Sequence, residues 1–121
     1  MNQRPRVMML VERFPPDLGG VARSAGRIAG ALRDAGADPH VLAWTKTLPP
    51  GVLETSDAGT VVPSAHDVSL HRLGLYGNLD FSLQHTMNVL EWLHGQFRFD
   101  AVWGHYLYPA GFMAVLFAEW V

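Results

Sequence analysis

The chain has 121 residues, a formal net charge of -2 at pH 7, 49% hydrophobic residues and 17% charged residues. This length suits one domain or part of one, and the apolar content excludes a disordered chain. The small negative charge, without a long basic run, argues against nucleic acid as a partner, and the absence of cysteine excludes disulfides and thiolate metal sites.

The first predicted element is a strand from Arg6 to Val11, RVMMLV. Its continuous apolar run is typical of a strand buried on both faces of a parallel sheet. Glu12 ends this run too early for a signal peptide, and Glu119 interrupts the apolar tract near the end of the sequence. We therefore expect no transmembrane segment and a soluble, cytoplasmic protein, with contact at the membrane face as an alternative.

A helix is predicted to begin near Val21, because apolar residues then recur at spacings of three and four. Gly36 predicts its end, since glycine tolerates the left-handed conformation found there. PHVLAW, from Pro39 to Trp44, is predicted as the next strand. Strand, helix and strand with short connections indicate a βαβ unit.

The rest of the sequence predicts further strands and helices. We expect a long loop over residues 45–63, with a short strand at Thr60–Val62, and then a strand at Val68–Leu73. A helix is predicted at Phe81–His94, with Asn78, Asp80 or Ser82 as its cap. A strand at Phe99–Trp103 and a last helix from about Pro109 follow. The predicted fold is α/β, a Rossmann-like parallel sheet flanked by helices. The first strand should lie inside the sheet, with the strand at Phe99–Trp103 beside it.

The loop between the first strand and the first helix, RFPPDLGG, is a candidate anion site. Gly19 and Gly20 have no side chains, so a ligand can approach their amides closely. The helix that follows directs its free N–H groups at the same place. A simple turn in which glycine relieves strain is the alternative. Neither G-x-G-x-x-G nor a Walker motif is present.

Charged residues flank this loop. Arg23 and Arg27 lie one turn apart on the predicted helix, where they can reach an anion or form a solvated face. Glu12 and Asp17 are the acids nearest the end of the first strand, and two carboxylates suit acid–base chemistry. The simpler interpretations are that Glu12 caps or forms an ion pair with Arg13, and that Asp17 helps the turn.

None of the histidines has a spacing typical of a metal site, so no metal is predicted. Five of them are expected at the surface or in turns: His40, His66, His71, His85 and His94. His105 differs because it follows the strand at Phe99–Trp103, at the carboxyl end where open sheets bind ligands. His105 and its neighbour Tyr106 are therefore candidates for ligand contact, with a loop histidine held by backbone groups as the alternative.

Two segments carry a family resemblance: RVMMLVERFPPDLGGVARSAGRIAGALRDAGADPHVLAW and FDAVWGHYLYPAG. They resemble the GT-B glycosyltransferases of the family-four type, which open with a strand, a "PP…GG" loop, a helix ending in glycine and an "HVL" strand. The same family carries a later FD-x-V-x-x-H strand and loop. The resemblance runs from about Arg6 to the end, although residues 45–63 match nothing firmly.

The resemblance implies two Rossmann-like domains facing across a cleft. Residues 1–121 would be a partial N-terminal, acceptor-side domain, and the C-terminal domain that holds most of the donor would be absent. The implied activity is retaining transfer of a hexosyl group from a nucleotide-diphosphate sugar to a sugar, lipid-linked or small-molecule acceptor. It implies no metal or other cofactor, and it implies that the fragment alone is inactive.

The resemblance also implies roles for particular residues. Gly19 and Gly20 would contact the donor diphosphate, and His105, Tyr106 and Arg23 would lie on the acceptor side. Trp103 stands where the family often has a first histidine, which favours acceptor contact over catalysis for His105. The family's paired glutamates, E-x7-E, are absent because they belong to the C-terminal domain, so the catalytic residues are unknown.

The sequence leaves two other functional classes open and predicts self-association. A free-standing flavodoxin-like binding or interaction domain with an anion-binding glycine loop is the main alternative. A dinucleotide-dependent oxidoreductase is weaker, because Trp44-Thr45-Lys46 stands where that class has an acid. The fragment is expected to self-associate through the exposed edge at Phe99–Trp103 or through the apolar last helix.

Overall fold

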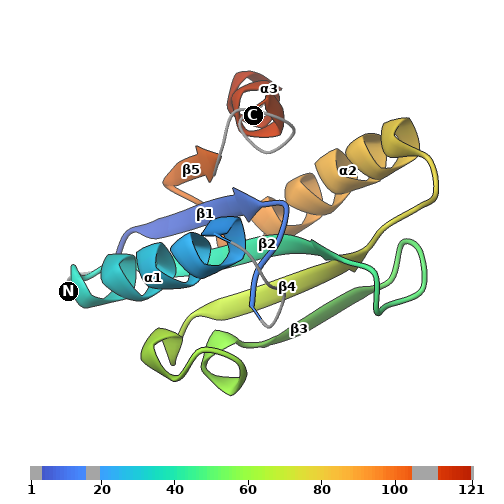
Figure 1. The fold of residues 1–121 in the computed structure, drawn as a ribbon. Coiled ribbons are helices and arrows are strands. Elements are labelled where there is room, and N and C mark those ends of the chain that lie inside the picture. Colours follow the sequence, from blue (N-terminus) through green and yellow to red (C-terminus); the bar gives the residue numbers. More distant parts are fainter. Residues whose placement is uncertain (1–3, 16–19, 105–111, 121) are drawn as a thin grey trace.

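The computed structural model describes residues 4–15, 20–104 and 112–120. Its elements are β1 (Arg6–Val11), α1 (Gly20–Asp34), β2 (Asp38–Thr45), β3 (Leu53–Asp57), the short 3-10 helices η1 (Ala58–Thr60) and η2 (Pro63–Ala65), β4 (Ser69–Gly74), α2 (Leu79–Phe97), β5 (Ala101–Gly104) and α3 (Phe112–Trp120). The strands form one five-stranded sheet in the order β3-β4-β2-β1-β5 (Figure 1). All neighbouring strands are parallel except β3 and β4, so the predicted α/β fold is confirmed.

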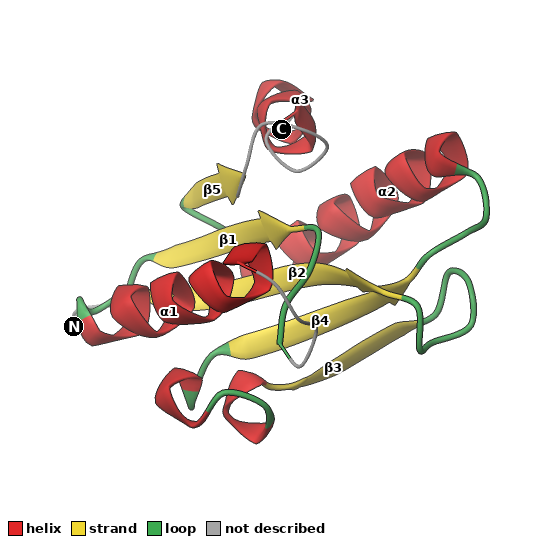
Figure 2. Ribbon diagram, in the orientation of Figure 1, coloured by secondary structure: helices red, strands yellow, loops and turns green. Residues whose placement is uncertain are grey.

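Helices cover both faces of this sheet (Figure 2). Met8 and Leu10 of β1 belong to a core cluster with residues of α2 and α3. Met9 and Val11 belong to a second cluster on the opposite face, with residues of α1, η1 and η2. Because successive side chains of a strand point to opposite faces, a strand covered on both sides needs a continuous apolar run. This explains the sequence of β1.

The prediction for residues 45–63 is partly wrong. No strand forms at Thr60–Val62, since Thr60 belongs to η1, which the Asp57 carboxylate caps by accepting from the Gly59 amide at 2.7 Å. A strand forms earlier instead, as β3, antiparallel to β4 at the edge of the sheet. Its sequence, LETSD, is polar and partly exposed, so it has no hydrophobic alternation by which to recognise it.

Several other element boundaries differ from the predictions by a few residues. Helix α2 starts two positions before Phe81, and the Asn78 side chain caps it by accepting from the Phe81 amide at 3.2 Å. The helix continues beyond His94 and ends where Arg98 adopts a left-handed φ of 58°. Strand β5 begins at Ala101. The predicted start of the last helix at Pro109 lies outside the described residues.

Gly74 offers a test of this arrangement. A Cβ atom at this position would lie 2.0 Å from the Pro49 carbonyl oxygen and 2.9 Å from that of Leu48. Since these are backbone atoms, Gly74→Ala is expected to lower the free energy of unfolding by about 2 kcal/mol. Gly77→Ala is the matched control, because no atom lies within 4 Å of its added Cβ. Urea unfolding compares the two variants, and equal midpoints would contradict the packing described for Gly74.

Candidate functional site

A pocket of about 430 Å³ lies at the carboxyl ends of three neighbouring parallel strands. The residues after β1, the end of β2 and the residue after β4 line it: Glu12, Arg13, Trp44, Thr45, Lys46, Thr47 and Leu75. Carboxyl ends of parallel strands meet at one edge of a sheet, which is where open α/β folds bind ligands. The volume lies within the range of small-molecule sites.

Hydrogen bonds fix the floor of this pocket. The buried Trp44 indole donates from Nε1 to Thr86 Oγ1 of α2 at 2.9 Å. Thr45 is also buried, and its Oγ1 accepts from the Thr47 amide at 3.1 Å. The Leu75 amide donates to the Thr45 carbonyl oxygen at 3.1 Å. These contacts hold the ends of β2 and β4 in a fixed relation, so the pocket is largely preformed.

The rim of the pocket is charged and exposed. Glu12 and Arg13 follow β1, and Lys46 follows β2. No ion pair involving Glu12 occurs in the described part of the chain, so the expected pairing of Glu12 with Arg13 is wrong. Two cations suit an anionic ligand such as a phosphate group. A carboxylate on the same rim can accept a proton or a hydroxyl hydrogen bond.

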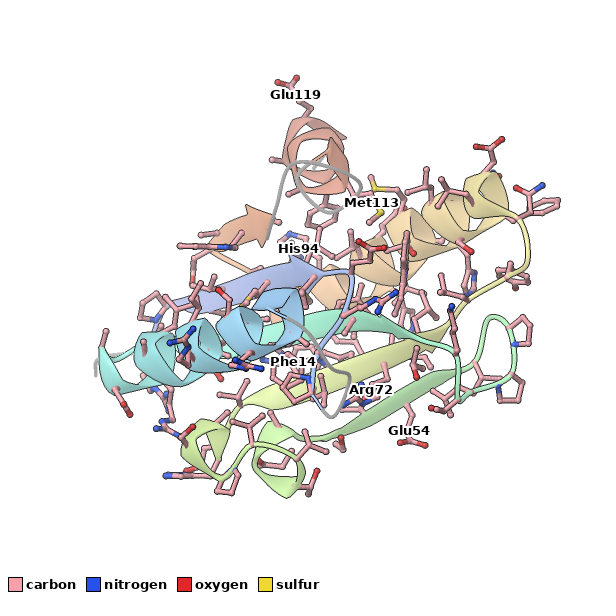
Figure 3. All side chains as sticks on the ribbon, viewed as in Figure 1. Phe14, Glu54, Arg72, His94, Met113 and Glu119 are labelled. Carbon is pink, nitrogen blue, oxygen red and sulfur yellow. The ribbon has the colours of Figure 1, made fainter. Side chains whose placement is uncertain are left out.

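The segment after β1 is anchored before it reaches α1. Phe14 is fully buried in the core cluster that contains Ala25 and Ala29 of α1. The Arg72 guanidinium of β4 donates to the Pro15 carbonyl oxygen. In Figure 3 the labelled Phe14 and Arg72 appear near each other below α1. These two contacts direct the chain from β1 toward the start of α1.

Gly20 is the first residue of α1 and is exposed. Among the described residues, no atom lies within 4 Å of the position that a Cβ would take there. The first turn of α1 contains no acidic residue to neutralise the positive end of its dipole. The anion site predicted at Gly20 stays a prediction. Gly19 and Asp17 lie outside the described residues.

The predicted acceptor-side residues are only partly described. Arg23 lies in the first turns of α1, exposed and without an ion pair or hydrogen bond to another described residue. Arg27 is exposed on the same helix. His105 and Tyr106 lie outside the described residues, and Gly104 before them ends β5. The predictions for His105 and Tyr106 therefore stay predictions.

Two of the five histidines expected at the surface are buried. His40 of β2 is 2% exposed and His71 of β4 is 1% exposed. His40 Nδ1 lies 3.1 Å from His71 Nε2, and Thr55 Oγ1 lies 2.9 Å from His71 Nδ1. Burial, and then the neighbouring His40, lower the pKa of His71 to about 4. Burial also lowers the pKa of His40, against an opposing effect from Asp38.

Most of the pocket lining is not among the residues predicted from the sequence. Trp44, Thr45 and Lys46 count in the sequence only as evidence against an oxidoreductase, although their place at the end of the second parallel strand is a signal for a ligand site. Within residues 4–15, 20–104 and 112–120, no three His, Asp or Glu side chains gather as metal ligands. In the same ranges, no helix is both long and apolar enough to span a membrane.

Comparison with known proteins gives one match. A family model described as "Glycosyl transferase 4-like domain" matches residues 19–120. No curated protein and no solved structure matches the chain. The match covers most of the sequence, from the glycine pair through α3.

Proposed function

The chain belongs to the glycosyltransferase 4-like family, and on that premise we propose that it contributes to retaining transfer of a hexosyl group from a nucleotide-diphosphate sugar. Membership of the family implies a sugar donor and an acceptor. The acceptor that we propose is a sugar, a lipid-linked compound or another small molecule carrying a hydroxyl group. Donors of this kind place the reaction in the cytoplasm, or at its membrane face for a lipid-linked acceptor.

The observation that supports this proposal is the pocket at the carboxyl ends of β1, β2 and β4, with Arg13 and Lys46 on its rim. Gly20 begins α1 after the same strand that Arg13 follows. In the transfer step, the bond between the anomeric carbon and the donor diphosphate breaks, and the diphosphate leaves with the electron pair. The acceptor hydroxyl oxygen bonds to the same face of the anomeric carbon, and its proton passes to the leaving diphosphate. Helix N–H groups and side-chain cations stabilise the negative charge that develops on this leaving group. No metal cofactor is needed for that role.

We propose that residues 1–121 form an acceptor-side part of a GT-B enzyme, and that most of the donor site lies in a second domain. Residues 1–121 alone are then inactive. Gly19 and Gly20 contact the donor diphosphate, whereas His105, Tyr106 and Arg23 face the acceptor. Self-association of this fragment through the edge strand β5 or through α3 stays a prediction.

Lys46→Ala in the full-length enzyme tests the placement of the donor diphosphate. Loss of one charge-assisted hydrogen bond is expected to weaken binding of a nucleoside diphosphate about tenfold. UDP, GDP and ADP are titrated separately by calorimetry, and Arg27→Ala is the matched control because Arg27 does not line the pocket. Unchanged affinity in Lys46→Ala, or an equal loss in Arg27→Ala, would contradict the proposal. NMR of the transfer product then reports whether the anomeric configuration is retained.

A further inference from the structure

A second hollow surface lies along the outer side of α2, outside the pocket. Two adjoining depressions of about 180 Å³ and 350 Å³ share His85 and Asn88 in their lining. We call the combined surface the α2 groove; its residues are Gly51, Leu53, Tyr76, Phe81, Gln84, His85, Asn88, Val89 and Trp92. Phe81, His85, Asn88 and Trp92 recur at spacings of three and four, so they form one stripe of the helix.

Aromatic rings stand at both ends of the α2 groove. Phe81 is 62% exposed, Tyr76 is 37% exposed, and Trp92 is 55% exposed. Phe81 and Trp92 are separated along α2 by roughly 16 Å, at 1.5 Å per residue. Neither ring belongs to a core cluster in the described part of the chain. Large exposed rings that do not contribute to the core are typical of a surface that binds another molecule.

Polar groups lie between the aromatic ends. Gln84 and Asn88 are one helical turn apart, and their side chains form no hydrogen bond with another described residue. His85 Nε2 lies 3.1 Å from the Gly51 carbonyl oxygen, which can only accept, so Nε2 carries the hydrogen. The other ring nitrogen of neutral His85 is then an acceptor. The α2 groove thus offers two amides and one imidazole nitrogen to a ligand rich in hydroxyl groups.

The lining of the α2 groove contains no Asp, Glu, Lys or Arg. A phosphorylated ligand, a nucleic acid or an anionic lipid surface would find no opposite charge there. Sugar rings fit this chemistry, because a pyranose has an apolar C–H face that stacks on aromatic rings and hydroxyl groups that bond to amides. We therefore infer that the α2 groove binds the chain of a neutral oligosaccharide acceptor.

The position of the α2 groove supports the same inference. Leu75 lines the pocket at the strand ends, and Tyr76, the next residue, lines the α2 groove. An oligosaccharide whose reacting hydroxyl lies in the pocket can therefore continue past Tyr76 along α2. This extension rests on the proposed function of the pocket. It names the acceptor class as a glycan longer than one sugar ring.

Binding of neutral hexasaccharides to the full-length enzyme tests the inference. Cellohexaose, maltohexaose, mannohexaose and chitohexaose are each titrated by calorimetry, beside their monosaccharides. We expect at least one hexasaccharide to bind more tightly than its monosaccharide, and Trp92→Ala to weaken that binding about tenfold or more. Leu79→Ala is the matched control, because Leu79 is an exposed apolar residue of α2 outside the groove. The affinity of Leu79→Ala for the hexasaccharide should equal that of the parent enzyme.

Two results would overturn the inference. One is that no hexasaccharide binds, or that Trp92→Ala binds it as tightly as the parent enzyme does. The other is that Trp92→Ala lowers the unfolding midpoint while hexasaccharide binding is absent, which would show that another part of the polypeptide packs on the α2 groove.

Binding of UDP and GDP, measured on the same protein, separates this inference from the proposed function. If only hexasaccharide binding is missing, the inference about the α2 groove is wrong. If only nucleotide binding is missing, the proposed function of the pocket is wrong.

Discussion

Gly20→Val is expected to lower kcat/KM of the full-length enzyme by at least about 100-fold, the effect of removing a stabilising donor from a developing anion. A valine side chain at the first position of α1 would occupy the space through which we propose that the donor diphosphate approaches. The fold itself should tolerate the change, since no atom of the described residues lies within 4 Å of the added Cβ. The loss should therefore appear in the chemistry and in nucleotide binding, and not in stability.

Gly77→Val provides the matched control for this experiment. Its added Cβ also meets no atom within 4 Å, and Gly77 lies outside the pocket lining. Steady-state kinetics, titration with UDP and GDP, and a thermal melt are measured on both variants. If folded Gly20→Val turns over like the parent enzyme, the donor diphosphate does not bind at the start of α1.

Acidification is expected to destabilise the protein through the buried pair His40 and His71. The pKa of His71 is about 4 in the folded chain, against 6.5 when it is unfolded and exposed. Between these values the unfolded chain binds more protons, so the free energy of unfolding falls as the pH falls from 6.5 toward 4. The stabilisation is complete above pH 6.5, and about 3 kcal/mol is lost by pH 4. The lowered pKa of His40 acts in the same direction.

Hydrogen bonding gives a structural reason for the neutral pair. His40 Nδ1 and His71 Nε2 face each other at 3.1 Å, and only one of these two atoms can carry a hydrogen. If both rings carried hydrogen at these atoms, two donors would face each other inside the sheet. Arg6 adds a positive charge that also lowers the pKa of His40. Full protonation therefore breaks the hydrogen bond between the two rings.

Urea unfolding measured from pH 7.5 to pH 4 tests this expectation. His71→Gln keeps a polar side chain beside Thr55 but cannot titrate, so its loss of stability over this range should be smaller than that of the parent. His66→Gln is the control, because His66 is exposed and its removal leaves the buried pair intact. Parallel stability profiles for the parent and His71→Gln would show that the buried pair does not titrate on unfolding.

Local patterns in the sequence were sufficient for β1, α1 and β2, and they placed Asn78 among three candidate caps of α2. The continuous apolar run from Arg6 to Val11 is needed because both faces of β1 are covered, and the same residues form the strand. Gly36 has a φ of 100°, so α1 is followed by a left-handed residue, as the presence of glycine at this position predicted. Strands, helices and their ends are short-range structures, which is why local sequence reveals them.

Contacts between distant segments decided the rest. Strand β3 exists because its polar backbone pairs with β4, so its own residues carry no strand pattern. His40 and His71 are buried because β2 and β4 are neighbours in the sheet, although 31 positions separate the two residues in sequence. The pocket likewise forms only where the ends of β1, β2 and β4 meet. The sequence by itself determined the α/β class and the glycine that ends α1, whereas strand order alone brings Arg13 and Lys46 to one rim. Pairing between segments far apart in the chain is a tertiary event that no local pattern encodes.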